Sequence, residues 1–313
     1  MKKPQVIAVS GPTASGKSDL ALKLAKELDG EIVCMDSMQI YRRMDIGTAK
    51  PTQQEQAMVP HHMLDIIDPT ENYAVADYTR ETEKVLTQII DRGKQPILVG
   101  GTGLYLKALM HGLSLGNASG DEKIRARLVA IADEPDGKNE LHRKLSEVDP
   151  VSAAKFHPND IRRVIRALEV FELTGKPISQ QKPVEQESNF QFLPLAIDMP
   201  REILYARLEK RVYTMMDQGL LQEVRDLLDS GVTAQMQSMQ GIGYKELIPV
   251  LLENQTLENA VWQIILNTRH YAKRQGTWLR TEPKTVWITE EPEKRFDVAM
   301  KQINAFRKGI LQV

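Results

Sequence analysis

A glycine-rich segment near the start of the chain has the spacing of a phosphate-binding loop. Residues 11–18 read GPTASGKS, which matches the pattern G-x-x-x-x-G-K-[ST]. In such a loop, backbone N–H groups at a helix start converge on phosphate oxygens, the lysine adds positive charge and the hydroxyl can bind Mg²⁺. The residues expected to bind a phosphate-bearing ligand, with Ser18 as the metal ligand, are Gly11, Pro12, Thr13, Ala14, Ser15, Gly16, Lys17 and Ser18.

Two other polar residues follow short apolar runs. Asp36 comes after residues 31–35, and Thr102 comes after residues 96–99 and a glycine pair. Because the carboxyl ends of parallel strands border the ligand crevice of an open sheet, both side chains should face the phosphate loop. A carboxylate there can be a metal ligand or a base, and the sequence leaves both interpretations open beside that of a helix N-cap.

Three weaker candidates favour structural roles. His61 and His62 are adjacent, and neighbours in a strand point to opposite faces, so a shared metal site is not favoured. Cys34 lies within an apolar run, which indicates a core position. Trp278 could stack on a base, but its helical spacing is more typical of a core residue.

Alternating strands and helices must position these side chains. Apolar runs predict strands over residues 5–10, 31–35, 96–99, 193–197 and 285–288. Helical spacing predicts helices over 20–28, 75–92, 121–133, 140–147, 150–156, 159–174, 201–218, 220–230, 244–253, 257–280 and 296–308. This order indicates an α/β fold, a P-loop parallel sheet flanked by helices, with an all-helical insertion domain.

The insertion is expected over residues 113–192, between loop-like residues 112–120 and a polar connector over 180–192. The catalytic core would then comprise residues 1–112 and 193–313. Six basic residues over 155–182 and five over 267–284 form two local basic patches, although the net charge of the whole chain is −1. A polyanion partner can therefore be argued only from these patches, and a basic helix face is often just solvated.

Composition excludes several classes of protein. With 313 residues, of which 42% are hydrophobic and 27% charged, the chain can bury a large core and is not expected to be disordered. A single cysteine excludes an internal disulfide framework and a cysteine-based metal cage. No apolar run approaches the ~18 residues of a membrane span, and no signal peptide is recognisable, so we expect a soluble cytoplasmic protein with no membrane partner.

Several longer strings resemble one enzyme family. They are GPTASGKS at 11–18, MDSMQIY at 35–41, DIGTAKP at 45–51, VGGTGLY at 99–105, HPND at 157–160 with RALEV at 166–170, GIGYKE at 241–246 and KRQGTWLR at 273–280. Together they closely resemble the bacterial tRNA dimethylallyltransferases, also called tRNA isopentenyltransferases. The matches run from residue 11 to residue 280.

This resemblance implies a prenyltransferase that acts in tRNA modification. It would move a dimethylallyl group from dimethylallyl diphosphate to N6 of the adenosine 3′ of the anticodon, with Mg²⁺ as cofactor. Asp36 would accept the proton of the adenine amine, Thr102 would hydrogen-bond at the reacting centre, and Lys17 with Arg211 would bind the diphosphate. An adenine within an anticodon loop must be flipped out to reach such a centre.

The resemblance also implies a set of tRNA contacts with the anticodon stem-loop. They lie after two strands that should end at the phosphate loop, at one position and in one helix of the insertion, and in two motifs nearer the C-terminus. These residues are Asp36, Ser37, Met38, Gln39, Thr102, Arg125, Arg162, Arg163, Val164, Ile165, Arg166, Gln240, Gly241, Ile242, Gly243, Tyr244, Lys245, Lys273, Arg274 and Gln275. The protein is expected to be a monomer.

Three alternatives remain at this stage. A P-loop small-molecule kinase that uses ATP would explain residues 1–110, but it leaves the basic helices at 155–182 and 267–284 without a function. A relative that prenylates free AMP is expected to lack the helical insertion. A nucleotide-gated RNA-binding switch would need a base-reading motif, and no Asn-Lys-x-Asp guanine motif is present.

Overall fold

The computed structural model describes residues 3–114, 120–181, 184–185 and 187–311. The chain divides into two compact units, one of residues 1–111 with 187–313 and one of residues 112–186. In the first unit, a six-stranded sheet has the strand order β3-β2-β4-β1-β7-β8, and all its neighbouring strands are parallel. This confirms the expected α/β fold with a parallel sheet. The strands are β1 (Gln5–Ser10), β2 (Gly30–Cys34), β3 (His61–His62), β4 (Gln95–Val99), β7 (Gln191–Ile197) and β8 (Val286–Ile288).

Side chains of the strands alternate between two buried cores. On β1, Val6 and Ala8 face one core, while Ile7 and Val9 face the other. The second core also includes Leu24 of α1 (Lys17–Glu27) and further apolar residues of α13 (Arg295–Arg307). Both faces of the sheet are therefore covered, as the continuous apolar character of its strands predicts.

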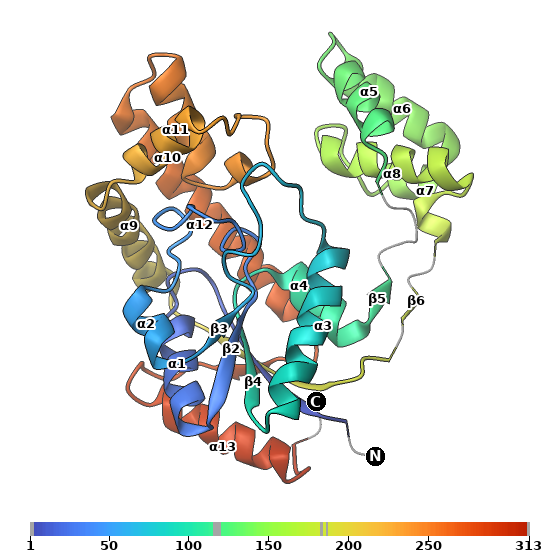
Figure 1. Cartoon of the computed structure of the whole chain (residues 1–313). Coiled ribbons are helices and arrows are strands. Elements are labelled where there is room, and N and C mark those ends of the chain that lie inside the picture. Colours follow the sequence, from blue (N-terminus) through green and yellow to red (C-terminus); the bar gives the residue numbers. More distant parts are fainter. Residues whose placement is uncertain (1–2, 115–119, 182–183, 186, 312–313) are drawn as a thin grey trace. The chain divides into compact units, whose positions relative to one another are not determined.

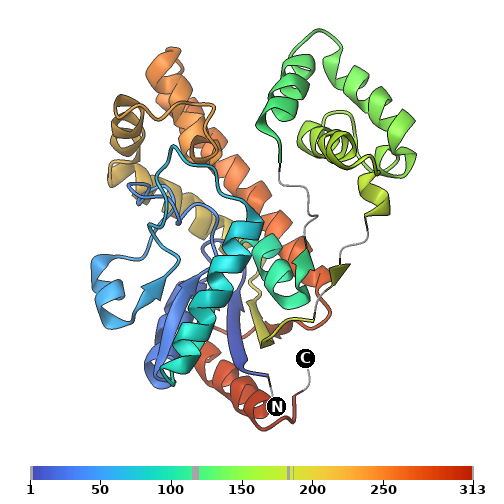
Figure 2. The same ribbon diagram turned by 45° about the vertical axis from the view of Figure 1, so that its right-hand side comes forward.

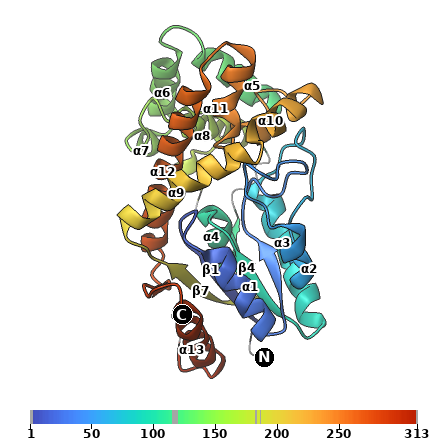
Figure 3. The same cartoon turned by 90° about the vertical axis from the view of Figure 1, so that its left-hand side faces the viewer.

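The helices of the first unit cover the sheet, and several of them lie beyond the carboxyl ends of its strands. Figure 3 shows α9 to α12 above the sheet, at the end where the chain leaves β1, and α13 at the opposite end. The helices are α1 (Lys17–Glu27), α2 (Gln53–Met58), α3 (Val75–Asp91), α4 (Gly103–His111), α9 (Arg201–Asp217), α10 (Leu220–Asp229), α11 (Tyr244–Leu252), α12 (Leu257–Thr281) and α13 (Arg295–Arg307). A short 3₁₀ helix, η2 (Ser238–Gln240), precedes α11.

The second unit is mainly helical. Its four helices, green to yellow-green in Figures 1 and 2, pack around a core that includes Leu128, Leu141, Leu145 and Val164. They are α5 (Glu122–Ala132), α6 (Gly137–Val148), α7 (Pro150–Ala153) and α8 (Ile161–Thr174), followed by the 3₁₀ helix η1 (Ile178–Gln180). The strands β5 (Leu113–Ser114) and β6 (Val184–Glu185) pair antiparallel within this unit.

The sequence prediction differs from the structure mainly at short or wholly buried elements. The sequence indicated no helix at α2 or α4, and it placed loop-like segments where β5 and β6 lie. The apolar residues of α4 lie on most sides of the helix, so its sequence carries no clear helical period. β7 begins at Gln191 because Phe192 joins the core of the first unit, so the expected connector over 180–192 contains the start of a central strand. Residues 115–119, 182–183 and 186 of the two expected connecting segments lie outside the described residues.

Candidate active site

A cavity of about 130 Å³ lies where the strands of the sheet end. Its wall combines the phosphate loop, the ends of β2 and β4, the loop before α2, and the helices α9 and α12. The polar residues that line it include Thr13, Lys17, Ser18, Asp36, Gln39, Lys50, Arg211, Tyr271 and Gln275. The structure thus brings together residues that lie as far apart as positions 13 and 275, several of which the sequence marked as site residues.

The phosphate loop takes the conformation that its glycines permit. Gly16 has φ 91° and caps the start of α1, which places it in the left-handed region that favours glycine. At Gly11, a Cβ atom would lie 2.8 Å from Ser15 Oγ and 3.2 Å from the Ile197 carbonyl oxygen. Both glycines are therefore required by the backbone, and the loop directs the positive end of α1 toward the cavity.

Two cations of the cavity are electrostatically unfavourable in the absence of an anion. Burial, followed by the nearby Arg211 guanidinium, lowers the pKa of Lys17 to about 8, and the Asp36 carboxylate only partly opposes this. Burial also lowers the pKa of Arg211, against the influence of Asp36. Among the described residues, neither cation forms a salt bridge; Lys17 Nζ donates to the Pro12 carbonyl at 3.4 Å. Both side chains would gain from a bound anion.

Asp36 and Thr102 follow the adjacent strands β2 and β4, and Asp36 lines the cavity whereas Thr102 is not among its lining residues. Asp36 Oδ1 accepts the backbone N–H of Met38 at 2.9 Å, and Thr102 Oγ1 accepts the N–H of Ser37 at 3.2 Å. Asp36 lies in a turn and does not cap a helix, so the N-cap interpretation is wrong. Its carboxylate lines the cavity beside Lys17 and is available to a ligand.

Gln275 of α12 connects the phosphate loop to the turn after β4. Its Oε1 accepts the Thr13 N–H at 2.9 Å, and its Nε2 donates to the Gly101 carbonyl at 3.0 Å. A Cβ atom at Gly101 would lie 2.0 Å from that amide nitrogen, so a larger residue there would displace the Gln275 carboxamide from this position. The Gln275 carboxamide, expected among the tRNA contacts, is therefore buried and bound to protein groups in this structure.

The sequence did not single out Tyr271, which lies one turn before Gln275 and also lines the cavity. Burial, followed by the Asp36 carboxylate, raises the pKa of its phenol to about 12, so the hydroxyl stays neutral. The sequence could have indicated this position, because Tyr271 precedes Gln275 by four residues and the two therefore share one face of the helix.

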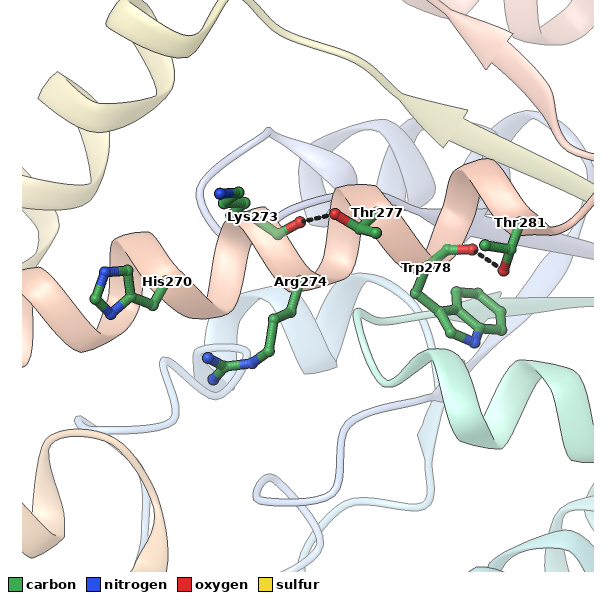
Figure 4. Close-up of a pocket in the computed structure, with 6 residues that line it drawn as sticks. All are labelled: His270, Lys273, Arg274, Thr277, Trp278 and Thr281. Carbon is green, nitrogen blue, oxygen red and sulfur yellow. Dashed lines mark hydrogen bonds between the residues drawn. The ribbon is translucent and has the colours of Figure 1, made fainter. Parts of the chain in front are cut away.

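A second hollow, of about 500 Å³, follows another face of α12. Figure 4 shows Arg274 and Trp278 on the same side of the helix, with Lys273, Thr277 and Thr281 farther around it. Lys273 and Arg274 are exposed. The Trp278 ring lies so close to Gly103 that a Cβ there would be 2.3 Å from it. Trp278 therefore packs on the core and also lines an open, positively charged surface.

The motif at 240–245 is divided between surface and interior. Gln240 and Lys245 are exposed, and Ile242 is partly buried. A Cβ at Gly241 would lie 2.6 Å from the Met38 side chain, and Gly243 has φ 100° before the start of α11. Tyr244 is 1% exposed, so its side chain cannot reach a ligand at the surface. The resemblance placed all of these residues at the tRNA, and the structure limits exposed side chains to Gln240 and Lys245.

In the second unit, two of the expected tRNA-binding arginines bind a buried carboxylate. Arg125 Nη2 lies 3.0 Å from Glu169 Oε1, and Arg166 Nη1 lies 2.7 Å from Glu169 Oε2. Burial alone would raise the pKa of Glu169, but the hydrogen bonds from Arg166 and Arg125 lower it below the ordinary value. Glu169, which the sequence did not single out, therefore holds α5 and α8 together.

The remaining residues of that helix segment separate by face. Arg162 and Arg163 are exposed, and Arg163 pairs with Asp160 at 3.2 Å. Val164 and Ile165 are 0% and 6% exposed, and both belong to the core of the second unit. The expectation that these two side chains contact tRNA is incorrect for this structure, because helical geometry turns them inward.

The described part of the chain offers no group of three or more His, Cys, Asp or Glu side chains that could hold a metal ion. His61 Nδ1 lies 2.7 Å from the Val59 carbonyl, and His62 Nε2 lies 2.6 Å from Glu31 Oε2. Mg²⁺ commonly keeps several waters and binds through substrate phosphates with one or two protein oxygens. The exposed Ser18 hydroxyl and the nearby Asp36 carboxylate fit that manner of binding.

Comparisons with known proteins agree with this site. Residues 39–282 match the family model described as IPP transferase. The tRNA dimethylallyltransferase of Geobacter metallireducens is 47% identical over 307 residues, which cover 97% of this chain and 98% of the relative. That of Pelotomaculum thermopropionicum is 43% identical, with 99% and 98% covered.

Solved structures give the same result. The full-length tRNA isopentenylpyrophosphate transferase of Bacillus halodurans has a TM-score of 0.72 at 42% identity and covers 97% of this chain and 96% of its own. A eukaryotic dimethylallyltransferase, described as acting on tRNA, has a TM-score of 0.77 at 31% identity and covers 98% and 80%. The chain therefore belongs to the IPP transferase family, and it is an enzyme of the tRNA dimethylallyltransferase kind.

Proposed function

We propose that this protein transfers a dimethylallyl group from dimethylallyl diphosphate to N6 of the adenosine 3′ of the anticodon in tRNA. The products would be N6-(dimethylallyl)adenosine and diphosphate. The observation that carries the proposal is the cavity in which two half-buried cations, Lys17 and Arg211, lie beside the Asp36 carboxylate. The two cations would bind the diphosphate of the donor. The Asp36 carboxylate could accept the proton that the adenine amine loses.

The phosphate loop, Lys17 and Arg211 would hold the diphosphate of the donor. When the bond between C1 of the dimethylallyl group and the diphosphate oxygen breaks, the electron pair stays on that oxygen and its negative charge increases. Cations and loop N–H groups that are already fixed in place stabilise this charge without rearrangement. Binding of the anionic diphosphate would also favour the charged forms of Lys17 and Arg211, which burial disfavours.

Asp36 and Thr102 would serve the acceptor. As the N6–C1 bond forms, N6 loses a proton, and Asp36 is positioned to take it. The Thr102 hydroxyl lies at the next strand end and would hydrogen-bond at the reacting centre. Ser37, Met38 and Gln39 would meet the flipped base.

Mg²⁺ would be held by Ser18 and by phosphate oxygens of the donor. When bound, it would neutralise part of the charge of the diphosphate. The protein groups act alongside it: Lys17 and Arg211 orient the diphosphate, and Asp36 holds the proton.

Recognition of the tRNA would use the exposed cations. Lys273 and Arg274 lie on the open face of α12, and Arg162 and Arg163 lie on the outer face of α8 in the helical unit. Because phosphate contacts supply most of the affinity for nucleic acids, these residues are the strongest candidates for backbone contacts. We further propose a cytoplasmic monomer; no helix in the described residues is long and apolar enough to cross a bilayer.

An assay with labelled dimethylallyl diphosphate and unmodified tRNA tests the proposal. A parallel measurement of ATP hydrolysis tests the alternative of a kinase. We expect label in the tRNA, no tRNA-independent ATP turnover, and a loss of about 10²–10⁴-fold in rate for Asp36→Ala with nearly unchanged tRNA affinity. The full rate in Asp36→Ala would remove the base assignment. Phosphate transfer from ATP to a small molecule would instead favour the kinase interpretation, which the relatives do not support.

A further inference from the structure

The loop of residues 45–51 forms part of the cavity wall but carries none of the groups assigned to the reaction. Thr48, Ala49, Lys50 and Pro51 line the cavity opposite the phosphate loop. This loop contains no helix or strand, so contacts from other elements must fix its shape. If this loop became ordered only when the ligand bound, the loss of conformational entropy would weaken ligand binding.

One carboxylate from a distant part of the chain binds this loop. Glu223 of α10 accepts three consecutive backbone N–H groups: its Oε2 lies 2.9 Å from Asp45 N and 2.7 Å from Ile46 N, and its Oε1 lies 3.1 Å from Gly47 N. Three amides that converge on one anion form a fixed geometry, and a neutral or shorter side chain cannot satisfy all of them.

Tyr244 completes this arrangement from α11. Its hydroxyl donates to Glu223 Oε1 at 2.6 Å. Burial, followed by the Glu223 carboxylate, raises the pKa of this phenol well above its ordinary value, so the hydroxyl remains a donor. The Tyr244 ring lies against Gly47, where a Cβ atom would be 2.5 Å from it. The tyrosine thus fixes the carboxylate and covers the loop.

The other side of the loop is connected to the site itself. Gln39 Nε2 donates to the carbonyls of Thr48 at 3.0 Å and Ala49 at 3.2 Å. Lys50, whose side chain is 4% exposed, pairs with Asp45 at 2.5 Å and Asp65 at 2.6 Å. The contacts of Glu223 therefore lead through the loop to Gln39, which lines the cavity.

We propose that Glu223 and Tyr244 are positioning residues that preorganise the 45–51 loop as the wall of the donor cavity. Neither side chain lines the cavity, and both act through the loop backbone. This inference rests on the proposed function, because the ligand it concerns is the prenyl diphosphate. It assigns to Tyr244 a role inside the protein in place of a tRNA contact.

The test measures loop order and donor binding separately in the full-length protein. Glu223→Ala should speed hydrogen exchange at the amides of residues 45–47 and raise both Kd and KM for dimethylallyl diphosphate about tenfold or more, with kcat changed less than about threefold. Glu223→Gln should show a smaller effect, and Tyr244→Phe, which keeps the ring on Gly47, the smallest. Asp226→Ala is the matched control, because Asp226 is an exposed carboxylate on the same helix that pairs with Gln222.

Unchanged exchange at residues 45–47 in Glu223→Ala would overturn the proposed contact. Faster exchange with an unchanged donor Kd, or a fall in kcat alone, would overturn its role in donor binding. If Glu223→Ala does not fold, Glu223→Gln and Tyr244→Phe decide by the same criteria. A wild-type protein that fails to bind the donor would overturn the proposed function itself, and this result is distinguishable because the exchange measurement needs no ligand.

Discussion

The cations of the cavity and those of the helical unit have different partners. In the helical unit, Arg125 and Arg166 bind Glu169, whose side chain is 0% exposed and whose lowered pKa reports that attraction. In the cavity, Lys17 and Arg211 are half-buried. Removal from water lowers the pKa of each, and the Arg211 guanidinium lowers that of Lys17 further.

This contrast separates two uses of positive charge that look alike in a sequence. A cation bound to a buried carboxylate stabilises the fold, and removing it leaves an unpaired buried charge. A buried cation that lacks such a partner costs stability and gains only when an anion binds. We therefore assign Arg125 and Arg166 mainly to the stability of the helical unit, and Lys17 and Arg211 to the ligand.

The largest expected effect concerns the cavity. Lys17→Met or Arg211→Met should lower kcat/KM for the donor by about 10²–10³-fold, because each removes a fixed charge that stabilises the leaving diphosphate. The free energy of unfolding should stay constant or rise, since an unfavourable buried charge is lost. Kinetics and thermal unfolding measure the two quantities, with Lys23→Met, exposed on α1, as the control. A marked loss of stability with normal kinetics would reverse the assignment.

The opposite pattern is expected in the helical unit. Arg125→Met combined with Arg166→Met removes two cations from the buried Glu169 carboxylate, which keeps the hydrogen bond from the Asp121 N–H, 3.0 Å away. Because the arginines are 51% and 33% exposed, we expect a loss of about 1–2 kcal/mol, less than for a fully buried pair. Hydrogen exchange of α5 and α8 measures this loss, and Arg143→Met on α6 is the control. Unchanged exchange with weakened tRNA binding would make both arginines ligand residues.

Acid should weaken the same cluster. The pKa of Glu169 is lower in the folded protein than in the unfolded chain, so the unfolded state binds its proton first as the pH falls. The stabilisation is complete above the unfolded pKa, about 4.3, and is lost as the pH falls through the folded pKa. The protection factors of the α8 amides, which are exchange rates corrected for the intrinsic effect of pH, should therefore fall below about pH 4.3 in wild type. Glu169→Gln should lack this component, and an identical acid response in both proteins would exclude Glu169 as its source.

Much of this arrangement follows from local sequence patterns. The positions of Asp36 and Thr102 could be predicted because parallel strands end at one edge of a sheet, and the phosphate loop because its glycines and lysine have fixed spacing. Helices with one clear apolar face, such as α3 and α9 to α12, were predicted nearly to their ends.

Contacts between distant segments could not be predicted in this way. Glu223 and Gln275 each lie on an amphipathic helix. Nothing in the sequence around Glu223 indicates that it binds the amides of residues 45–47, and nothing around Gln275 indicates that it accepts the Thr13 N–H. The helical period likewise shows that α8 has a buried face, but it does not show that Glu169 lies on it with Val164 and Ile165. Burial of a charge depends on the partners that tertiary packing supplies.

The smallest expected effect concerns the exposed arginines of the helical unit, whose charges remain accessible at the surface. Arg162→Ala with Arg163→Ala should weaken tRNA binding about three- to tenfold, and it should reduce the salt dependence of log Kd by roughly 0.7–0.9 for each lost phosphate contact. Protein stability should change little, because the contacts that Arg163 would lose, the ion pair with Asp160 and a cation–π contact 5.8 Å from the centre of the Phe156 ring, involve an exposed guanidinium. Binding titrations over a range of salt concentrations measure both quantities, and Lys138→Ala on α6 provides a control that also removes one positive charge from this unit. A salt slope equal to that of wild type would remove this face of α8 from the tRNA interface, whereas a loss of stability would show that its arginines resemble Arg125 and Arg166.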